Sequence, residues 1–285
     1  MTSIVLDGLV QGLQLALLSV GIVFVYGLGG VLNLAHGQLA VAGGLAVAIL
    51  RAARWNPLLA STAGVVVAGS MALLLDRTLL RAAYARRGEE RLLLGLILTL
   101  GVSFALDGFY ALWAPNVALT LRMPSPSMEM LGIRVRTASL AVGGLSLVTF
   151  AVLLAFLRWT RVGQAIRCII QNEVGAVLCG VDVERVRALT LFLSGMLAGV
   201  AGLAQGFSSY LGPEMGTEFT ILAIIVAVVG GVRSLTGTFL ASLLLGLVNS
   251  ALSYTVGTYL TWIVLLTVAV LTLLVRPEGL LAYWP

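Results

Sequence analysis

The chain contains no lysine, one histidine and two cysteines, and only 10% of its 285 residues are charged. Without lysine it cannot form a phosphate-binding loop of the GxxxxGK[ST] kind or a lysine Schiff base. A single histidine, His36, excludes a site with several histidine ligands, and the spacing of Cys168 and Cys179 fits no metal motif. These absences argue against ATP hydrolysis or metal chemistry within this chain.

Charge is missing altogether from two long runs, residues 8–50 and 234–275, which are 43 and 42 residues long. A helix crosses the hydrocarbon core of a bilayer in roughly 20 residues, so each run is long enough for two crossings. Backbone polar groups in lipid must pair with one another, which makes helical crossings the expectation. The sequence therefore predicts an all-α, polytopic transmembrane bundle that forms a single domain over residues 1–285. About eight or nine spans are expected, some of them broken, over residues 6–29, 37–53, 57–75, 92–112, 138–157, 188–209, 219–232, 238–254 and 258–275.

The distribution of arginine predicts the orientation of the chain. If the polar segments 76–91 and 158–187 lie on one side of the membrane, that side carries twelve of the 17 arginines and the other side carries five. The positive-inside rule makes the arginine-rich side cytoplasmic, with the N-terminus outside and the C-terminus inside. The net charge of +5 follows from this asymmetry and does not indicate nucleic-acid binding.

The most polar stretch of the chain is the loop over residues 158–187. Within it, Gln164, Arg167 and Gln171 share one face of a predicted helix, and apolar residues recur at three- and four-residue steps elsewhere. Those apolar positions are Ile166, Ile170, Val174, Val177, Leu178 and Val181. The pattern predicts an amphipathic helical unit on the cytoplasmic surface.

Capping residues divide this unit into helices. Asn172 is suited to cap a short second helix, with Glu173 in its first turn. Gly180 is suited to end that helix in the left-handed conformation, and Asp182 is suited to cap the next one. Two roles remain open for the unit: a helix lying on lipid headgroups, or an element that docks into a groove on a partner protein.

Four separated stretches resemble the branched-chain amino-acid ABC transporter permeases. The longest, TRVGQAIRCIIQNEVGAVLCGVDVERVRALTLFLSGMLAGVAG, is similar to the cytoplasmic loop and following helix of that family. The other three are VLNLAHGQLAVAGG at 31–44, AIIVAVVGGVRSLTGTFLASLLLGLV at 223–248 and RPEGLL at 276–281. All four stand in the order in which the family has them. The chain resembles the first, H-type permease of the pair, because GLVQGLQLALLSVGIVFVYG comes at its very start.

The resemblance implies a non-enzymatic permease of an ATP-driven importer in the bacterial plasma membrane. The implied partners are a second homologous permease, two ATP-binding cassette ATPases, an extracytoplasmic solute-binding protein and the lipid bilayer. No cofactor is expected in this chain, since ATP and magnesium would be held by the ATPases. The implied substrates are branched-chain amino acids, although similar permeases carry urea, short amides and aromatic solutes.

The resemblance also makes the loop the part of the permease that contacts the ATPases. Where the family often has Glu-Ala-Ala, this chain has Glu173-Val174-Gly175, and glycine weakens a helix by about 1 kcal/mol relative to alanine. The residues carried over to ATPase coupling, mainly over 163–183, are Gly163, Arg167, Gln171, Asn172, Glu173, Gly180 and Asp182.

Two glycine-interrupted segments, 31–44 and 216–238, are candidates for the translocation pathway. Short or broken segments in both halves of a transporter point to its substrate route. The candidate residues are Asn33, His36, Gly37, Gln38, Glu218 and Thr220. His36 has two open roles: contact with the substrate, or support of the broken backbone. Family members often carry an acid at the position of Gln38.

Two other function classes compete with the importer permease. A stand-alone secondary transporter or channel usually needs an acid buried inside the membrane, and the acids Asp107 and Glu218 both fall near the predicted outer ends of spans. A membrane-embedded enzyme would need a nucleophile and a base, and the sequence has no GxSxG nucleophile elbow. Copurification with ATPases would distinguish the importer permease from both of these classes.

Overall fold

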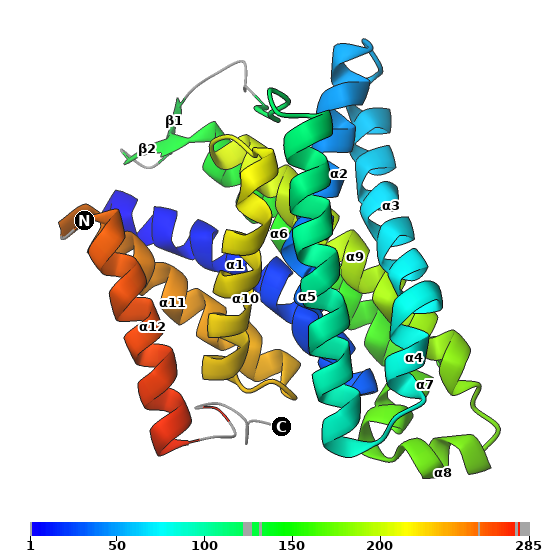
Figure 1. Cartoon of the computed structure of the whole chain (residues 1–285). Coiled ribbons are helices and arrows are strands. Elements are labelled where there is room, and N and C mark those ends of the chain that lie inside the picture. Colours follow the sequence, from blue (N-terminus) through cyan, green and yellow to red (C-terminus); the bar gives the residue numbers. More distant parts are fainter. Residues whose placement is uncertain (1, 122–126, 131–132, 256, 277–278, 280–285) are drawn as a thin grey trace.

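The computed structural model describes residues 2–121, 127–130, 133–255, 257–276 and 279. Of the RPEGLL stretch, only Arg276 and Gly279 are among them. The described chain is a bundle of helices with one short hairpin (Figure 1). The helices are α1 (Thr2–Gly29), α2 (His36–Ala52), α3 (Pro57–Leu75), the π-helical turn Asp76–Leu80, α4 (Arg81–Tyr84), α5 (Gly88–Trp113), α6 (Thr137–Trp159), α7 (Arg161–Gln171), α8 (Glu173–Leu178), α9 (Val183–Ser208), the 3₁₀ turn Pro213–Met215, α10 (Gly216–Gly230), α11 (Leu235–Thr255) and α12 (Thr258–Val275). The hairpin pairs β1 (Ser127–Met130) with β2 (Ile133–Arg136) in antiparallel register.

The prediction of a polytopic helical bundle is confirmed. Among the described residues, seven helices are long and apolar enough to cross a membrane, and two shorter apolar helices accompany them. The shorter ones are His36–Ala52 and Leu260–Val275. Helices α7 and α8 lie at one end of the bundle and the β hairpin lies at the other (Figure 1).

The predicted span 57–75 coincides with α3, and the polar segment 76–91 that follows it is largely helical. The helix of α3 continues through the π-helical turn and α4 to Tyr84. Arginine, leucine and alanine, which fill most of residues 77–83, are good helix formers, so charge alone does not end the helix there. The following helix begins at Gly88, before the predicted start of the next span.

Small residues let α9 pack closely against two neighbours. A Cβ at Gly195 would overlap Ala68 and Ala72 of α3, and a Cβ at Gly202 would overlap the backbone of Ala40 in α2. Membrane helices approach closely where their residues are small. The small-residue stripe of α9 therefore packs within this subunit.

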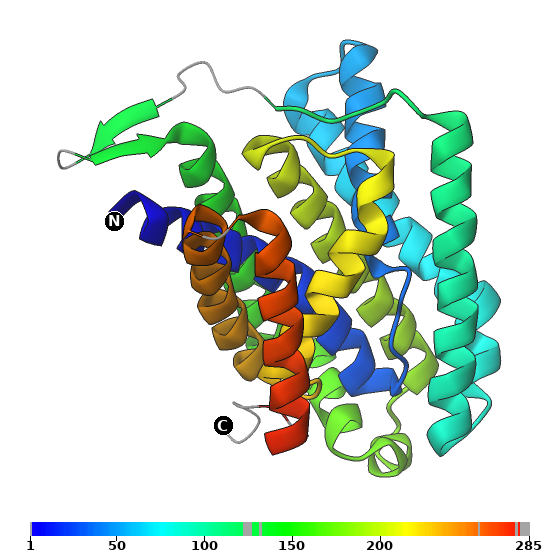
Figure 2. The same cartoon turned by 60° about the vertical axis from the view of Figure 1, so that its left-hand side comes forward.

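The connection between α1 and α2 is not helical. Gly30 ends α1 with φ +62°, and α2 begins only at His36. In Figure 2 the dark-blue connection runs up beside α10 before α2 starts, so α2 begins inside the bundle rather than at its surface. The broken segment predicted from glycine-flanked polar residues is present.

Candidate functional site

The helices α7 and α8 form a compact unit at one end of the bundle. Ile166 and Ile169 of α7 are buried, with 1% and 3% of their surface exposed, and they fix the helix against the bundle. The polar side chains of Gln164, Arg167 and Gln171 face outward. Burial of one stripe only is what an amphipathic helix predicts.

The predicted caps of this unit are all present. The Asn172 side chain accepts a hydrogen bond from the amide of Gly175 at 2.9 Å, and that of Asp182 accepts one from the amide of Arg185 at 3.1 Å. Gly180 has φ +80°, a backbone conformation that residues other than glycine and asparagine rarely adopt. These local bonds define where α8 and α9 begin and keep the unit compact.

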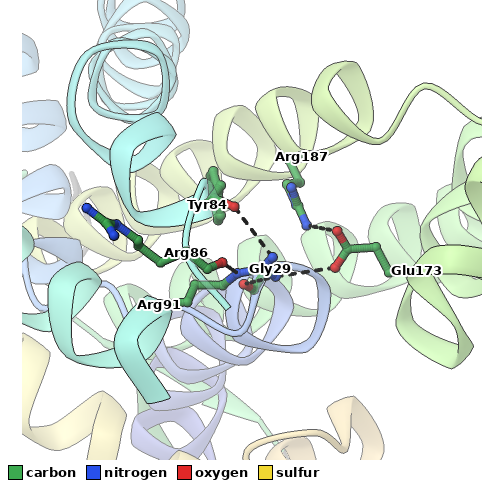
Figure 3. Close-up of polar contacts among 6 residues, drawn as sticks. All are labelled: Gly29, Tyr84, Arg86, Arg91, Glu173 and Arg187. Carbon is green, nitrogen blue, oxygen red and sulfur yellow. Dashed lines mark hydrogen bonds and ion pairs between the residues drawn. The ribbon is translucent and has the colours of Figure 1, made fainter. Parts of the chain in front are cut away.

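Glu173 ties the unit to two long helices. Its carboxylate accepts a hydrogen bond from Arg187 of α9 at 2.6 Å and another from Arg91 of α5 at 3.3 Å (Figure 3). Arg91 also donates to the carbonyl oxygen of Gly29 at the end of α1, at 3.4 Å. The Arg187 guanidinium lies 4.6 Å from the centre of the Tyr84 ring, a cation–π distance. We call Glu173, Arg91 and Arg187 the arginine clamp.

The clamp keeps Glu173 charged. Partial burial alone would raise the pKa of its carboxyl, but the guanidiniums of Arg187 and Arg91 outweigh burial and hold the pKa below its ordinary value of 4.5. Glu173 is therefore a charged link between the unit and the long helices, and sequence analysis, which placed it among the coupling residues, did not find its two partners.

The pathway candidates other than Glu218 gather where α2 and α10 begin. The amide of Gly37 donates to the hydroxyl of Thr220 at 2.9 Å, and Gln38 lies against Gly216. Asn33 accepts a hydrogen bond from the amide of Ala35 at 3.0 Å. We call this contact the α2–α10 junction.

The side chains of the junction are enclosed. His36 and Gln38 have no exposed surface, and Asn33 has 1%. The imidazole Nδ1 of His36 is 3.4 Å from the hydroxyl of Ser194. Glu218, by contrast, is exposed on α10 and does not join the others.

A polar cleft was missed by sequence analysis. It has a volume of about 440 Å³ and lies between α1, α6, α9, α10 and α11. Gln11 and Gln14 of α1 line it together with Gln205 of α9 and Asn249 of α11. The signal was present: Asp7, Gln11 and Gln14 are spaced four and three residues apart and so share one face of an otherwise apolar helix.

Comparisons with known proteins agree with this architecture. Residues 4–275 match the protein family described as branched-chain amino acid transport system / permease component. The chain is similar to the high-affinity branched-chain amino acid transport system permease protein LivH of Salmonella typhimurium, at 28% identity over 96% of this chain and 93% of that one. It is 27% identical to BraD of Pseudomonas aeruginosa over 96% of this chain and 94% of that one.

A solved structure shows a similar fold. PsaBC from Streptococcus pneumoniae in complex with Fab superimposes with a TM-score of 0.50 at 12% identity, and the match covers 98% of this chain and 92% of that one. Family membership also favours the importer permease over a stand-alone carrier. The chain belongs to the branched-chain amino acid transport permease family and is the transmembrane permease component of an ABC importer.

Proposed function

We propose that ATPase subunits dock on α7 and α8 and that this chain moves in response. The observation that carries the proposal is the apolar surface of α8, where Val174, Val177 and Leu178 are 70%, 56% and 84% exposed. Exposed apolar side chains gathered on a capped element are typical of an interaction surface. Helix α8 is also anchored by Glu173, so a force applied to it reaches the bundle.

The arginine clamp supports a route for that force. Movement of α8 displaces Glu173, which holds Arg187 at the start of α9 and Arg91 near the start of α5. Because Arg91 also holds the end of α1, three spanning helices respond together. A rigid unit with short charged links transmits displacement better than a flexible loop.

The proposed partners are those that membership of this permease family implies. The complex contains a second homologous permease, two ATP-binding cassette ATPases that hold ATP and magnesium, and an extracytoplasmic solute-binding protein. The chain itself needs no cofactor and binds no nucleic acid. The α7–α8 end faces the cytoplasm and the hairpin end faces outward, so the N-terminus is outside and the C-terminus inside. This orientation rests on the arginine asymmetry.

The substrate is a branched-chain amino acid or a similar small polar solute. The names of LivH and BraD support this class, since both describe high-affinity branched-chain amino acid transport. The α2–α10 junction, with Asn33, His36, Gly37, Gln38 and Thr220, then forms the closed middle of the pathway. Glu218, which is exposed, lies on the outer part of α10.

Substitution of Gly180 tests the docking role. Uptake of leucine is measured in liposomes that contain both permeases and the ATPases, supplied with the loaded binding protein. Gly180→Pro is expected to lower uptake at least tenfold while ATP hydrolysis continues, because proline fixes φ near −65°. Asparagine tolerates the φ of +80°, and a Cβ at this position meets no atom within 4 Å, so Gly180→Asn is the matched control and should transport normally.

Two outcomes contradict the proposal. Wild-type uptake by Gly180→Pro would show that α8 does not couple ATP hydrolysis to transport. Failure of ATPases to copurify with the permease would favour the alternative in which α8 rests on lipid.

A further inference from the structure

The polar cleft is open to its surroundings, whereas the α2–α10 junction is enclosed. Arg136 ends β2, and Ser139 lies in the first turn of α6 and bonds to Asp7, so these three lining residues mark the end of the cleft beside the hairpin, which we call its mouth. Residues Leu15, Leu18 and Phe219 are buried and form its apolar floor. From Asp7 to Leu18 the helix α1 advances about 16 Å at 1.5 Å per residue, so the cleft reaches about half the thickness of a bilayer core.

Four amide side chains line the cleft, in two hydrogen-bonded pairs. Gln14 pairs with Gln205 at 2.5 Å, and Asn249 pairs with Gln11 at 2.8 Å. The hydroxyl of Ser208 also donates to Gln14 at 3.3 Å. All four amides line the cleft and are only partly buried, and their hydrogen bonds leave each with donor or acceptor capacity. Polar side chains within apolar membrane helices are costly, and they are typical of a substrate route.

The charges of the cleft cancel. Its lining contains one acid, Asp7, and one base, Arg136, and both lie near the mouth. Asp7 accepts a hydrogen bond from Ser139 at 3.3 Å, and Arg136 donates to the carbonyl oxygen of Ser208 at 3.5 Å. A lining with no net charge does not favour a cation or an anion. It suits a solute that carries both charges or neither.

We propose that this cleft is an outward-facing transit site for a zwitterionic α-amino acid with an apolar side chain. Amide oxygens accept from its ammonium group and amide nitrogens donate to its carboxylate, while Leu15, Leu18 and Phe219 receive the side chain. The volume of about 440 Å³ leaves room for several waters around such a solute, so binding is weak and release is easy. The site rests on the importer function proposed above and gives it a location.

The floor of the cleft connects it to the closed junction. Leu18 belongs to α1, and Gly21, three residues further along, lies directly against the imidazole of His36. A Cβ at Gly21 would overlap that ring. One helix layer therefore separates a solute on the floor from the buried polar side chains. A displacement of α1, whose far end is held by Arg91, opens the route between them.

Cysteine labelling tests the site in the assembled complex. Ser253 lines the cleft, and Ser61 lines a separate cavity between α2, α3 and α9, so Ser253→Cys is the test and Ser61→Cys the matched control. A membrane-impermeant methanethiosulfonate reagent is added from outside. We expect labelling of Ser253→Cys to lower leucine uptake at least tenfold and labelling of Ser61→Cys to leave uptake unchanged. Millimolar leucine should slow labelling of Ser253→Cys, whereas lysine and the decarboxylated analogue isoamylamine should not.

A second variant measures the amide contacts directly. Gln14→Leu is expected to raise the KM for leucine about tenfold, and an unchanged KM would show that Gln14 does not contact the solute.

Three results overturn the site. Full uptake after labelling of Ser253→Cys would show that solute does not pass through the cleft, and equal protection by lysine would show that it does not select zwitterions. Absence of labelling in the complex, with labelling of the isolated subunit, would show that a partner covers it. Failure of the importer function is seen separately, as uptake by the unmodified complex that does not depend on ATP.

Discussion

The arginine clamp and the α2–α10 junction both secure a break between helices, but they do so by different means. The clamp uses long charged side chains, with distances of 2.6 Å and 3.3 Å between Glu173 and its two arginines. The junction uses close backbone approach, because a Cβ at Gly37 would overlap the carbonyl oxygen of Gly216. Charge is costly within the membrane and cheap at its surface. The junction is therefore expected to be rigid and intolerant of substitution, and the clamp adjustable.

Gly37→Ala is expected to have the largest effect. The added methyl group collides with Gly216 and Thr220, and overpacking of this kind costs about 3 kcal/mol. The thermal stability and abundance of the purified subunit should both fall. Gly101→Ala is the matched control, since a Cβ at Gly101 in α5 meets nothing within 4 Å. Equal stability of the two variants would show that the junction is as adjustable as the clamp.

Glu173→Arg is expected to destabilise less but to uncouple transport. It replaces both ion pairs by repulsion among three guanidiniums, at a cost of about 2 kcal/mol, between the values for exposed and buried pairs. The complex should assemble, and the leucine imported per ATP hydrolysed should fall at least tenfold. Glu173→Gln keeps the shape of the side chain and should lie between Glu173→Arg and wild type. Normal coupling in Glu173→Arg would mean that the clamp transmits no force.

His36→Ala separates a pathway role from a structural one at the junction. Loss of the ring removes its contact with Ser194 and its packing on Gly21. We expect uptake to fall about threefold or more, with a smaller change in the amount of assembled complex. If only abundance falls, His36 supports the broken backbone and does not act on the solute.

The smallest effect is the pH dependence of the clamp. The pKa of Glu173 is lower in the folded protein than its ordinary value of 4.5, so the ion pairs stabilise the fold fully above pH 4.5 and are lost as pH falls through the depressed pKa. The difference in melting temperature between wild type and Glu173→Gln should be constant near neutral pH and shrink below about pH 4.5. A constant difference down to lower pH would show that the charge of Glu173 contributes nothing.

Sequence reasoning succeeded where the determining contacts are local. The caps at Asn172 and Asp182 bond to amides three residues away, so their residue types alone indicate them. The same holds for Gly180, whose conformation favours glycine whatever surrounds it. The apolar runs predicted the helical bundle for a similar reason, since the number of residues that a span needs is set by the thickness of the bilayer.

Contacts between distant segments were beyond sequence reasoning. Glu173 meets Arg91 across 82 positions, and Gln14 meets Gln205 across 191. No spacing rule connects such pairs, because their meeting depends on how helices pack. Closeness in sequence can also mislead. Glu218 is two residues from Thr220, yet its side chain is exposed while that of Thr220 is buried.

The start of α2 inside the bundle has an electrostatic consequence. The N-terminal end of a helix carries a partial positive charge, and here that end lies among buried side chains, with the amide of Gly37 donating to the hydroxyl of Thr220. Half-helix ends of this kind repel protons and sodium ions from narrow passages. A helix end in this position therefore disfavours cations in its surroundings without the use of a charged side chain.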